Sequence, residues 1–373
     1  MHEATKQTAV RYRADHVGSF LRPKELIDAR LATPPNPAQL REIEDQAILR
    51  VLAKQKELGF DIFTDGEFRR SNFMGDFTDA VQGFNFMEGL RREWQGQQPG
   101  QRMQGPVRGI VTEKLRAVRP LTGHELPFMK QHSPGDIKMT LPSATQFPAI
   151  AFKFGVSDKV YKDHTALLWD IVEIIKAEMA RLADEGVKYI QIDAPRYSYY
   201  MDPKWRDWIR ENMRMDPESA LTEAVKADNA CMKAARRPGV TLAIHLCRGN
   251  ARSHWYAEGG YDAVAEKLFS TLEVDRFLLE YDDPRSGTFE PLRFIPRDKV
   301  VVLGLISSKL AQIEKQDDVI RRIHDAAKFF PLENLALSPQ CGFASVLEGN
   351  ALSEDEEWAK MRLVAETARR VWG

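Results

Sequence analysis

Short apolar runs alternate with longer amphipathic stretches along most of the chain. Eight runs have the length of a buried strand, and they span residues 13–20, 59–65, 135–142, 187–193, 239–247, 276–281, 299–306 and 333–339. Apolar positions recur at helical spacing in the stretches 38–57, 162–185, 218–236, 260–273, 316–329 and 354–371. This alternation predicts an α/β fold in which crossover helices join parallel strands.

Eight strand and helix units in 373 residues suit a (β/α)8 TIM barrel, formed as one domain over residues 1–373. A doubly wound open sheet shows the same alternation and stays as the alternative, because strand order cannot be read from a sequence. The segment 74–134 breaks the rhythm and is rich in Gly, Gln and Arg. Within it, residues 108–118 predict a small β-hairpin. We interpret the segment as an insertion that covers the mouth of the barrel.

Composition narrows the class of protein. Hydrophobic residues make up 43% of the chain, charged residues 29%, and the net charge is −1. Lys and Arg are scattered among acidic residues, so no nucleic-acid partner is expected. The N-terminus has no apolar core of a signal peptide, and no run approaches the roughly 18 apolar residues of a membrane span. Three cysteines do not suggest a disulfide framework. We expect a soluble, cytoplasmic protein that does not enter a membrane.

Polar residues follow the predicted strands at their C-terminal ends. They are His16, Ser19, Asp65, Glu67, Asp193, His245, Cys247, Glu280, Asp282, Asp283, Ser307, Ser308 and Cys341. In a barrel these ends share one face, which is where active sites form. Polar residues also occur wherever a strand becomes a loop. So many acids, with His and Cys, after apolar runs favour a functional face.

A metal centre is the first chemical candidate. His245 and Cys247 end one strand and Cys341 follows another, and Zn²⁺ prefers nitrogen and thiolate ligands in tetrahedral geometry. The plainer alternative is a hydrogen-bonded histidine near two small buried cysteines. Glu280 ends the next strand and is a candidate fourth ligand, although alone it would be an ordinary loop acid. Such an electron-rich ligand set suits the activation of a substrate thiol as thiolate, so it indicates thiol alkylation rather than hydrolysis.

Three further residues are candidates for binding a substrate. Asp193 and Glu67 could each hold an ammonium group, but an Asp at a strand end is often a helix cap, and Glu67 could simply pair with Arg69 or Arg70. The backbone at Gly18 and Ser19 could take a carboxylate, although Gly-Ser is also common turn chemistry. Each of these assignments is open at this stage.

Two more features have structural interpretations. The aromatic stretch 196–209 either forms a pocket wall or packs inside a buried loop. Cys231 lies in a helical pattern and is expected to be a small core residue.

Seven segments together resemble the cobalamin-independent methionine synthase family. The resemblance is strongest to the short bacterial members of the family, which correspond to the C-terminal catalytic barrel of the longer ones. The segments are DHVGSF, TDGEFRR, YIQID, HLCRGN, FLLEYDD, VVLGLISSK and LALSPQCGFAS. The resemblance runs from about residue 13 to the end. It implies a (β/α)8 barrel with zinc at its C-terminal face, held by His245, Cys247, Glu280 and Cys341.

The resemblance also implies that Ser19, Glu67 and Asp193 bind homocysteine, with the Gly-Ser backbone on its carboxylate and the acids on its ammonium. Two departures concern the methyl donor. Full-length synthases have an N-terminal half that helps to bind folate, which this sequence lacks. Their catalytic histidine corresponds to Ser307 here, and Ala194 stands where they tend to have Glu. The thiol half of the site therefore matches the family, whereas the donor half has changed.

The leading hypothesis is a zinc-dependent methyltransferase that makes methionine from homocysteine, or a close thioether from a similar thiol. Its donor would be methyltetrahydrofolate, methylcobalamin or a methyl-corrinoid protein, or another small methyl compound. An epoxyalkane:coenzyme M transferase is the alternative enzyme, although Glu67 and Asp193 would repel its sulfonate. A non-enzymatic module that binds zinc or a corrinoid protein is the third hypothesis.

Overall fold

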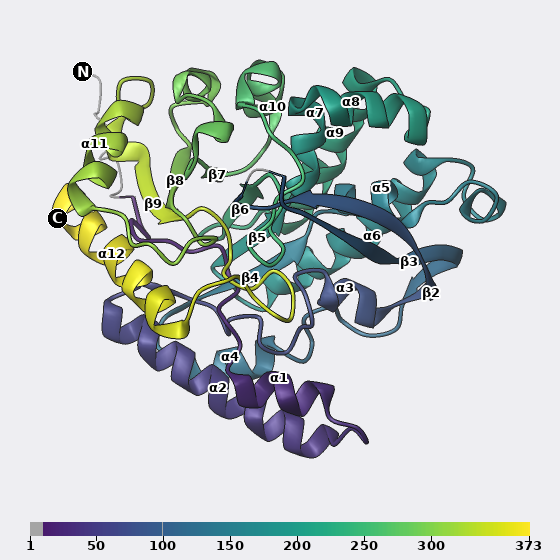
Figure 1. The fold of residues 1–373 in the computed structure, drawn as a ribbon, viewed down its shortest axis with the longest axis horizontal. Helices are drawn as coiled ribbons and strands as arrows, with labels where there is room; N and C mark the ends of the chain where they lie inside the picture. The colour runs from purple at the N-terminus through teal and green to yellow at the C-terminus, as the bar shows by residue number, and fades with distance from the viewer. Residues whose placement is uncertain (1–9, 99) are drawn as a thin grey trace.

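Seven parallel strands form the central sheet of the computed structural model, which describes residues 10–98 and 100–373. The order in the sheet is β1-β4-β5-β6-β7-β8-β9. The strands are β1 (Ile62–Phe63), β4 (Asp136–Pro142), β5 (Tyr189–Asp193), β6 (Thr241–Leu246), β7 (Arg276–Glu280), β8 (Val300–Ile306) and β9 (Leu335–Pro339). Figure 1 shows the strands curving around the centre of the molecule, with helices outside them. The α/β class and these seven strands agree with the apolar runs.

Six of the described helices lie in the predicted amphipathic stretches, and the others were not predicted. The described helices are α1 (Lys24–Leu31), α2 (Pro37–Leu58), α3 (Gly75–Ala80), α4 (Leu126–His132), α5 (Pro148–Ala151), α6 (His164–Asp184), α7 (Ser198–Met201), α8 (Pro203–Trp208), α9 (Pro217–Ala235), α10 (Ala265–Thr271), α11 (Gln316–Ala326) and α12 (Glu354–Trp372). Local signals define their starts: the Asp163 side chain caps α6, and Ser353 with Glu356 forms a capping box at α12. Within the described residues, none of the helices is long and apolar enough to cross a bilayer.

The prediction of a full strand over residues 13–20 was wrong. This segment makes one isolated parallel bridge, between Ala14 and Leu337 of β9. On its other side β1 is only two residues long, so there is little backbone with which to form a ladder. A side-chain contact takes the place of the ladder, because the Thr64 hydroxyl donates to the Gly18 carbonyl at 2.8 Å. The segment thus contacts both edges of the sheet without being a regular strand.

The insertion contains a long antiparallel ribbon rather than the small hairpin predicted within residues 108–118. Strand β2 (Val81–Gln95) pairs with β3 (Arg102–Ala117), so 108–118 belongs mostly to one strand of the pair. Its partner lies outside the segment that suggested a hairpin. Figure 1 shows the ribbon crossing in front of the sheet and running out toward α5, which contacts both strands.

The inside of the curved sheet is filled by side chains from almost every strand. One contiguous cluster consists of Tyr12, Val17, Ile62, Tyr189, Ala243, Leu278, Val302 and Ala336, all nearly inaccessible to solvent. Six of these come from six different strands, so they meet only because the sheet curls. Burial of this kind supplies the main driving force for the curvature.

A buried ion cluster centred on Asp15 ties the N-terminal segment to the sheet. Asp15 accepts hydrogen bonds from Lys138 of β4 and Tyr189 of β5, both at 2.8 Å. Arg276 of β7 lies 3.3 Å from the same carboxylate. Although burial opposes ionisation, the charges of Lys138 and Arg276 hold the pKa of Asp15 below its usual value. One carboxylate therefore joins three strands.

A second buried acid lies between α9 and the loop after β4. Asp228 accepts from the hydroxyl of Ser143 at 2.7 Å and from that of Tyr197 at 2.8 Å. No cation is paired with it among the described residues. Burial raises the pKa of Asp228 to about 7, although both hydrogen bonds oppose the rise. The folded protein thus favours the neutral acid at this position.

We predict that Asp15→Asn lowers the free energy of unfolding by about 3–5 kcal/mol, because Lys138 and Arg276 would stay buried without their counter-charge. Urea denaturation measures the loss. Asp28→Asn is the matched control, since Asp28 is exposed on α1 and pairs with the exposed Lys24; a change within about 0.5 kcal/mol is expected there. Equal stability of Asp15→Asn and the wild type would remove the ion cluster as a stabilising element.

A pH-dependent prediction concerns Asp228. Its folded pKa of about 7 exceeds the ordinary 3.8, so between these values the folded state holds a proton that the unfolded chain releases. Stability contributed by this group therefore falls as pH rises through that window. Relative to the wild type, Asp228→Asn should gain about 2–3 kcal/mol between pH 5 and 7. Asp184→Asn, on the exposed end of α6, should show a constant difference. A constant difference for Asp228→Asn would contradict the assignment.

Candidate metal centre and adjoining pocket

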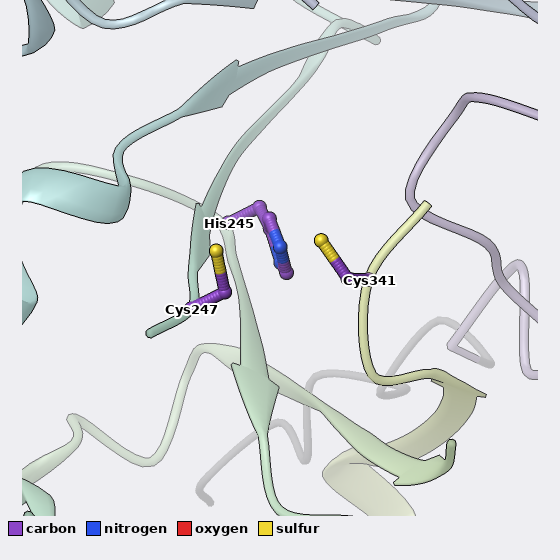
Figure 2. A group of neighbouring side chains, drawn as sticks. All are labelled: His245, Cys247 and Cys341. Atoms are coloured by element: carbon purple, nitrogen blue, oxygen red, sulfur yellow. The ribbon is translucent and has the colours of Figure 1, made fainter. Parts of the chain in front are cut away.

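Two distant parts of the chain meet at the C-terminal edge of the sheet. His245 lies in β6 and Cys247 follows its last residue, while Cys341 comes just after β9. The ligand atoms of these three buried residues all lie within 4.8 Å of one another. Figure 2 shows the imidazole between the two sulfur atoms, with Cys247 on one side and Cys341 on the other. The predicted trio is thus brought together.

The trio fits the demands of a zinc ion. Zinc bonds of about 2.3 Å to sulfur and about 2.0 Å to nitrogen, in tetrahedral geometry, separate neighbouring ligand atoms by about 3.5–3.8 Å. The ligand atoms, all within 4.8 Å of one another, are therefore at most about 1 Å beyond that range. Moreover, both ring nitrogens of His245 are buried without a hydrogen-bond partner among the described residues. A buried imidazole with neither nitrogen satisfied is costly, and a metal bond would satisfy one of them.

The electrostatics of the trio already favour one thiolate. A hydrogen bond between the two thiols lowers the pKa of Cys341 well below its usual value and raises that of Cys247, since they share a proton. His245 and Lys309 lie close enough to stabilise the charge on Cys341 further. Burial alone would lower the pKa of His245, but the Cys341 charge outweighs it and the pKa is raised.

The structure does not bring Glu280 into the trio, although its charge acts on both His245 and Cys247. Its carboxylate accepts from the backbone nitrogen of Arg248 at 2.6 Å and from Arg285 at 3.0 Å. The ammonium nitrogen of Lys309 is 3.7 Å away. These cations outweigh burial and lower the pKa of Glu280 to about 2. Its oxygens are thus directed at neighbouring cations.

A pocket of about 750 Å³ opens onto the trio. The residues predicted to bind substrate, Ser19, Glu67 and Asp193, line this pocket together with His245, Cys247 and Cys341. By contrast Glu280 and Ser307 are absent from its wall. The backbone nitrogen of Ser307 donates to Glu314 instead, so this serine belongs to a loop contact. Six of the candidate residues thus lie on one pocket, whereas Glu280 and Ser307 are not among its described lining residues.

The two acids of the pocket are buried and incompletely hydrogen-bonded. Glu67 accepts from the Thr140 hydroxyl at 2.8 Å through one oxygen, while its other oxygen has no partner among the described residues. Asp193 pairs in register with His245 and accepts from Gln191 at 2.8 Å. Burial raises the pKa of Asp193 to about 7, against the influence of His245. A cationic group entering the pocket would satisfy both carboxylates.

Ser19 lies beside Cys341 because the chain has a glycine there. A Cβ atom on Gly342 would come within 2.0 Å of the Ser19 hydroxyl, so only glycine allows the two segments to touch. The Ser19 hydroxyl accepts from the backbone nitrogen of Ala344, and the Ser19 carbonyl accepts from that of Phe343. The N-terminal segment and the loop that carries Cys341 therefore form one continuous wall.

Sequence analysis missed several residues of the pocket. Arg92 and Trp94 reach it from the ribbon, and Tyr256 from the loop after β6. Arg196 lies just behind, where its guanidinium stacks with Tyr256. None of residues 196–209 is among the described residues that line the pocket; the stretch packs in the core, which is the buried-loop alternative. Nothing in the sequence around Arg92 indicated its place in the wall.

Comparison with known proteins gives consistent matches over nearly the whole chain. Residues 14–367 match the family model described as cobalamin-independent synthase, catalytic domain. The uncharacterised protein YxjH of Bacillus subtilis is 40% identical over 98% of this chain and 96% of its own length. The methionine synthase of Saccharolobus solfataricus is 26% identical, over 87% of this chain and 86% of its own.

Solved structures agree in fold. A Listeria monocytogenes protein assigned as a vitamin-B12-independent methionine synthase has a TM-score of 0.71 and 28% identity, covering 98% of this chain and 99% of its own. The B12-independent methionine synthase of Shewanella sp. W3-18-1, solved in complex with selenomethionine, has a TM-score of 0.72 at 20% identity. The match covers 97% of this chain and 98% of that protein's chain. The second comparison supports the fold alone.

We predict that the purified chain holds one zinc ion and that Cys341→Ser weakens zinc affinity by at least about 100-fold, because loss of a direct ligand should exceed the effect of losing an outer hydrogen bond. Metal content per chain, measured by mass spectrometry after dialysis, tests this. Cys231→Ser is the control, since Cys231 is buried in α9 away from the trio. Full zinc content in Cys341→Ser would exclude Cys341 as a ligand.

Proposed function

Because the chain belongs to the family of cobalamin-independent methionine synthase catalytic domains, we propose that it is a zinc-dependent methyltransferase that methylates the thiol of homocysteine or a similar small thiol. The observation that carries the proposal is the buried group of His245, Cys247 and Cys341 at the base of an open pocket. Two sulfur ligands and one nitrogen ligand favour thiol activation over hydrolysis, for the reasons of charge given above.

The residues of the pocket have separate tasks in this scheme. His245, Cys247 and Cys341 would hold zinc, which when bound lowers the pKa of a substrate thiol. Glu67 and Asp193 would bind the ammonium group, which fits the unsatisfied buried oxygen of Glu67 and the buried carboxyl of Asp193. The wall at Ser19 would face the carboxylate. With both ends of the amino acid held, its sulfur is oriented for in-line attack on a methyl group. The S–CH3 bond forms as the bond from methyl to its carrier breaks.

Glu280 is proposed as the fourth, displaceable ligand. It neighbours the trio, but Arg285 and the backbone of Arg248 already engage its oxygens. A carboxylate shared with such partners would be a weak ligand, which a substrate thiolate could replace. Lys309, with its ammonium buried near Glu280, would compensate the charge in either arrangement.

We also propose an arrangement of the barrel around the site. We infer that residues 13–20, although they are not a regular strand, close the sheet into a barrel of the (β/α)8 type, with the whole chain as one catalytic domain. The ribbon of β2 and β3 would cover the barrel mouth, because its residues Arg92 and Trp94 line the pocket. The thiol ligands favour a reducing compartment, so we propose a cytoplasmic location. Neither nucleic acid nor a membrane is a proposed partner.

The identity of the methyl donor is the part of the reaction that stays unassigned. Methyltetrahydrofolate, methylcobalamin and a methyl-corrinoid protein are all candidates. Ser307, which corresponds to the histidine of the synthases, is outside the pocket wall. Ala194 is buried and offers no proton donor. The scheme thus has no general acid for the leaving group at either position, which favours a donor whose carrier leaves without protonation or with a proton from solvent.

We predict methionine formation from homocysteine when the zinc-loaded protein is mixed with one of methyltetrahydrofolate, methylcobalamin or S-methylmethionine. Mass spectrometry of the product identifies the donor. Coenzyme M with a short epoxide is the parallel arm for the alternative enzyme, and we expect no product because Glu67 and Asp193 face the tail. Bound zinc without alkyl transfer to any thiol would support the non-enzymatic module and overturn the proposal.

We predict that Glu67→Gln weakens homocysteine binding about 10–100-fold, because a hydrogen bond between charged groups contributes about 1.5–3 kcal/mol. Isothermal titration of the zinc-loaded protein measures the dissociation constant. Glu173→Gln, an exposed change on α6, should leave it unaltered. Unchanged affinity in Glu67→Gln would remove this residue from the substrate site.

A further inference from the structure

Two buried guanidinium groups lie beside the pocket without an acidic partner. Arg92 is 9% exposed and Arg196 is 2% exposed. Within residues 10–98 and 100–373, neither forms a salt bridge with any carboxylate. Arg92 donates to the Tyr199 hydroxyl at 2.6 Å, and Arg196 donates through Nε to the Gln146 carbonyl at 3.4 Å. Both terminal nitrogens of Arg196 have no partner there. Buried charges of this kind are normally paired.

Aromatic rings hold the two cations in place without neutralising them. The Arg92 guanidinium is 4.9 Å from the centre of the Tyr256 ring, and that of Arg196 is 5.3 Å from the same ring and 4.6 Å from Tyr199. Such contacts are favourable by about 0.5–2 kcal/mol each, but they leave the net charge of +2. Burial and the nearby Arg196 lower the pKa of Arg92 to about 10, which still leaves it charged at neutral pH.

The pair adjoins the Cys247 side of the metal centre. Arg92, Tyr256 and Cys247 all line the pocket, and the Tyr256 hydroxyl donates to the carbonyl of Pro195, the residue before Arg196. The proposed amino-acid site is on the other side, since Ser19 contacts the loop that carries Cys341. Figure 2 shows Cys247 and Cys341 on opposite sides of His245.

We propose that Arg92 and Arg196 bind an oxyanion carried by the methyl donor, so that the donor is a small anionic molecule. This inference rests on the proposed function and specifies the chemical class of the second substrate, the methyl donor. A carboxylate, phosphate or sulfonate would supply the missing counter-charge and could accept from Arg92, which lines the pocket, while Arg196, on the same Tyr256 ring, adds positive charge. Trp94 and Tyr256 would contact the apolar part of the same molecule, because both line the pocket next to Arg92.

The anion site is testable without turnover. Trp94 lines the pocket and Trp205 stacks on Tyr199 with ring centres 4.1 Å apart, so tryptophan fluorescence reports on this wall. Sulfate is titrated into the zinc-loaded protein at low, constant ionic strength, with chloride as the reference. We expect saturable sulfate binding that Arg92→Gln and Arg196→Gln each weaken about tenfold or more, and that the Lys variants weaken less. Arg210→Gln is the control, since Arg210 is exposed and pairs with the exposed Asp207.

A kinetic experiment then tests whether the bound anion is part of the methyl donor. With the donor found in the product screen, each Gln variant should raise its KM about tenfold or more, while the KM for the thiol and the zinc content stay unchanged. Absence of saturable sulfate binding in the wild type would overturn the inference, whatever the variants do. It would also be overturned if the thiol KM rose instead, or if methylcobalamin served as donor with an unaltered KM. Sulfate binding that persists in a protein without methyl transfer would instead count against the proposed function alone.

Discussion

The shared direction of the central strands is the constraint on which the rest of the molecule depends. Because β5 to β9 run parallel, their C-terminal ends emerge at one edge, where Asp193 is in register with His245 and Cys341 follows the last strand. Gly304 in β8 allows the backbone segments at this edge to approach one another closely. A side chain there would come within 2.7 Å of the Leu279 carbonyl and 2.8 Å of the Gln340 backbone, the residue just before Cys341.

The buried charges inside the curved sheet are paired with one another, whereas several buried polar groups at its C-terminal edge have no partner among the described residues. On the inner side, the carboxylate of Asp15 is matched by Lys138 and Arg276, so the buried charge stabilises the curl of the sheet. At the edge, buried polar atoms of His245 and Glu67, which both line the pocket, have no partner among the described residues. Unsatisfied groups that face an open pocket cost stability in the free protein, and a ligand would recover that cost. Their concentration around one pocket is the physical argument that it binds polar substrates.

The charges of the pocket are also separated by sign. Glu67 and Asp193 make one region acidic, whereas Arg92 in the lining, with Arg196 on the same Tyr256 ring outside the lining, makes another basic, and the metal-binding trio lines the same pocket. A reaction that joins two different molecules at one sulfur atom needs this kind of asymmetry, since each reactant is directed to its own end. The ribbon supplies Arg92, so an element outside the sheet contributes to the choice of the second molecule.

Local pattern in the sequence determined the seven strands, the long helices and the residues that could ligate a metal, because apolar periodicity and ligand chemistry are properties of neighbouring residues. It also grouped His245, Cys247 and Cys341, since parallel strands must end together. Tertiary structure alone decided the rest. Residues 13–20 did not become a strand because β1 is too short to pair with them, and the ribbon formed because 108–118 found a distant partner. Glu280 was held away from the trio by Arg285, and Arg92 met Arg196 across the pocket wall. Each of these outcomes depends on contacts between residues far apart in the chain, and no local pattern records such contacts.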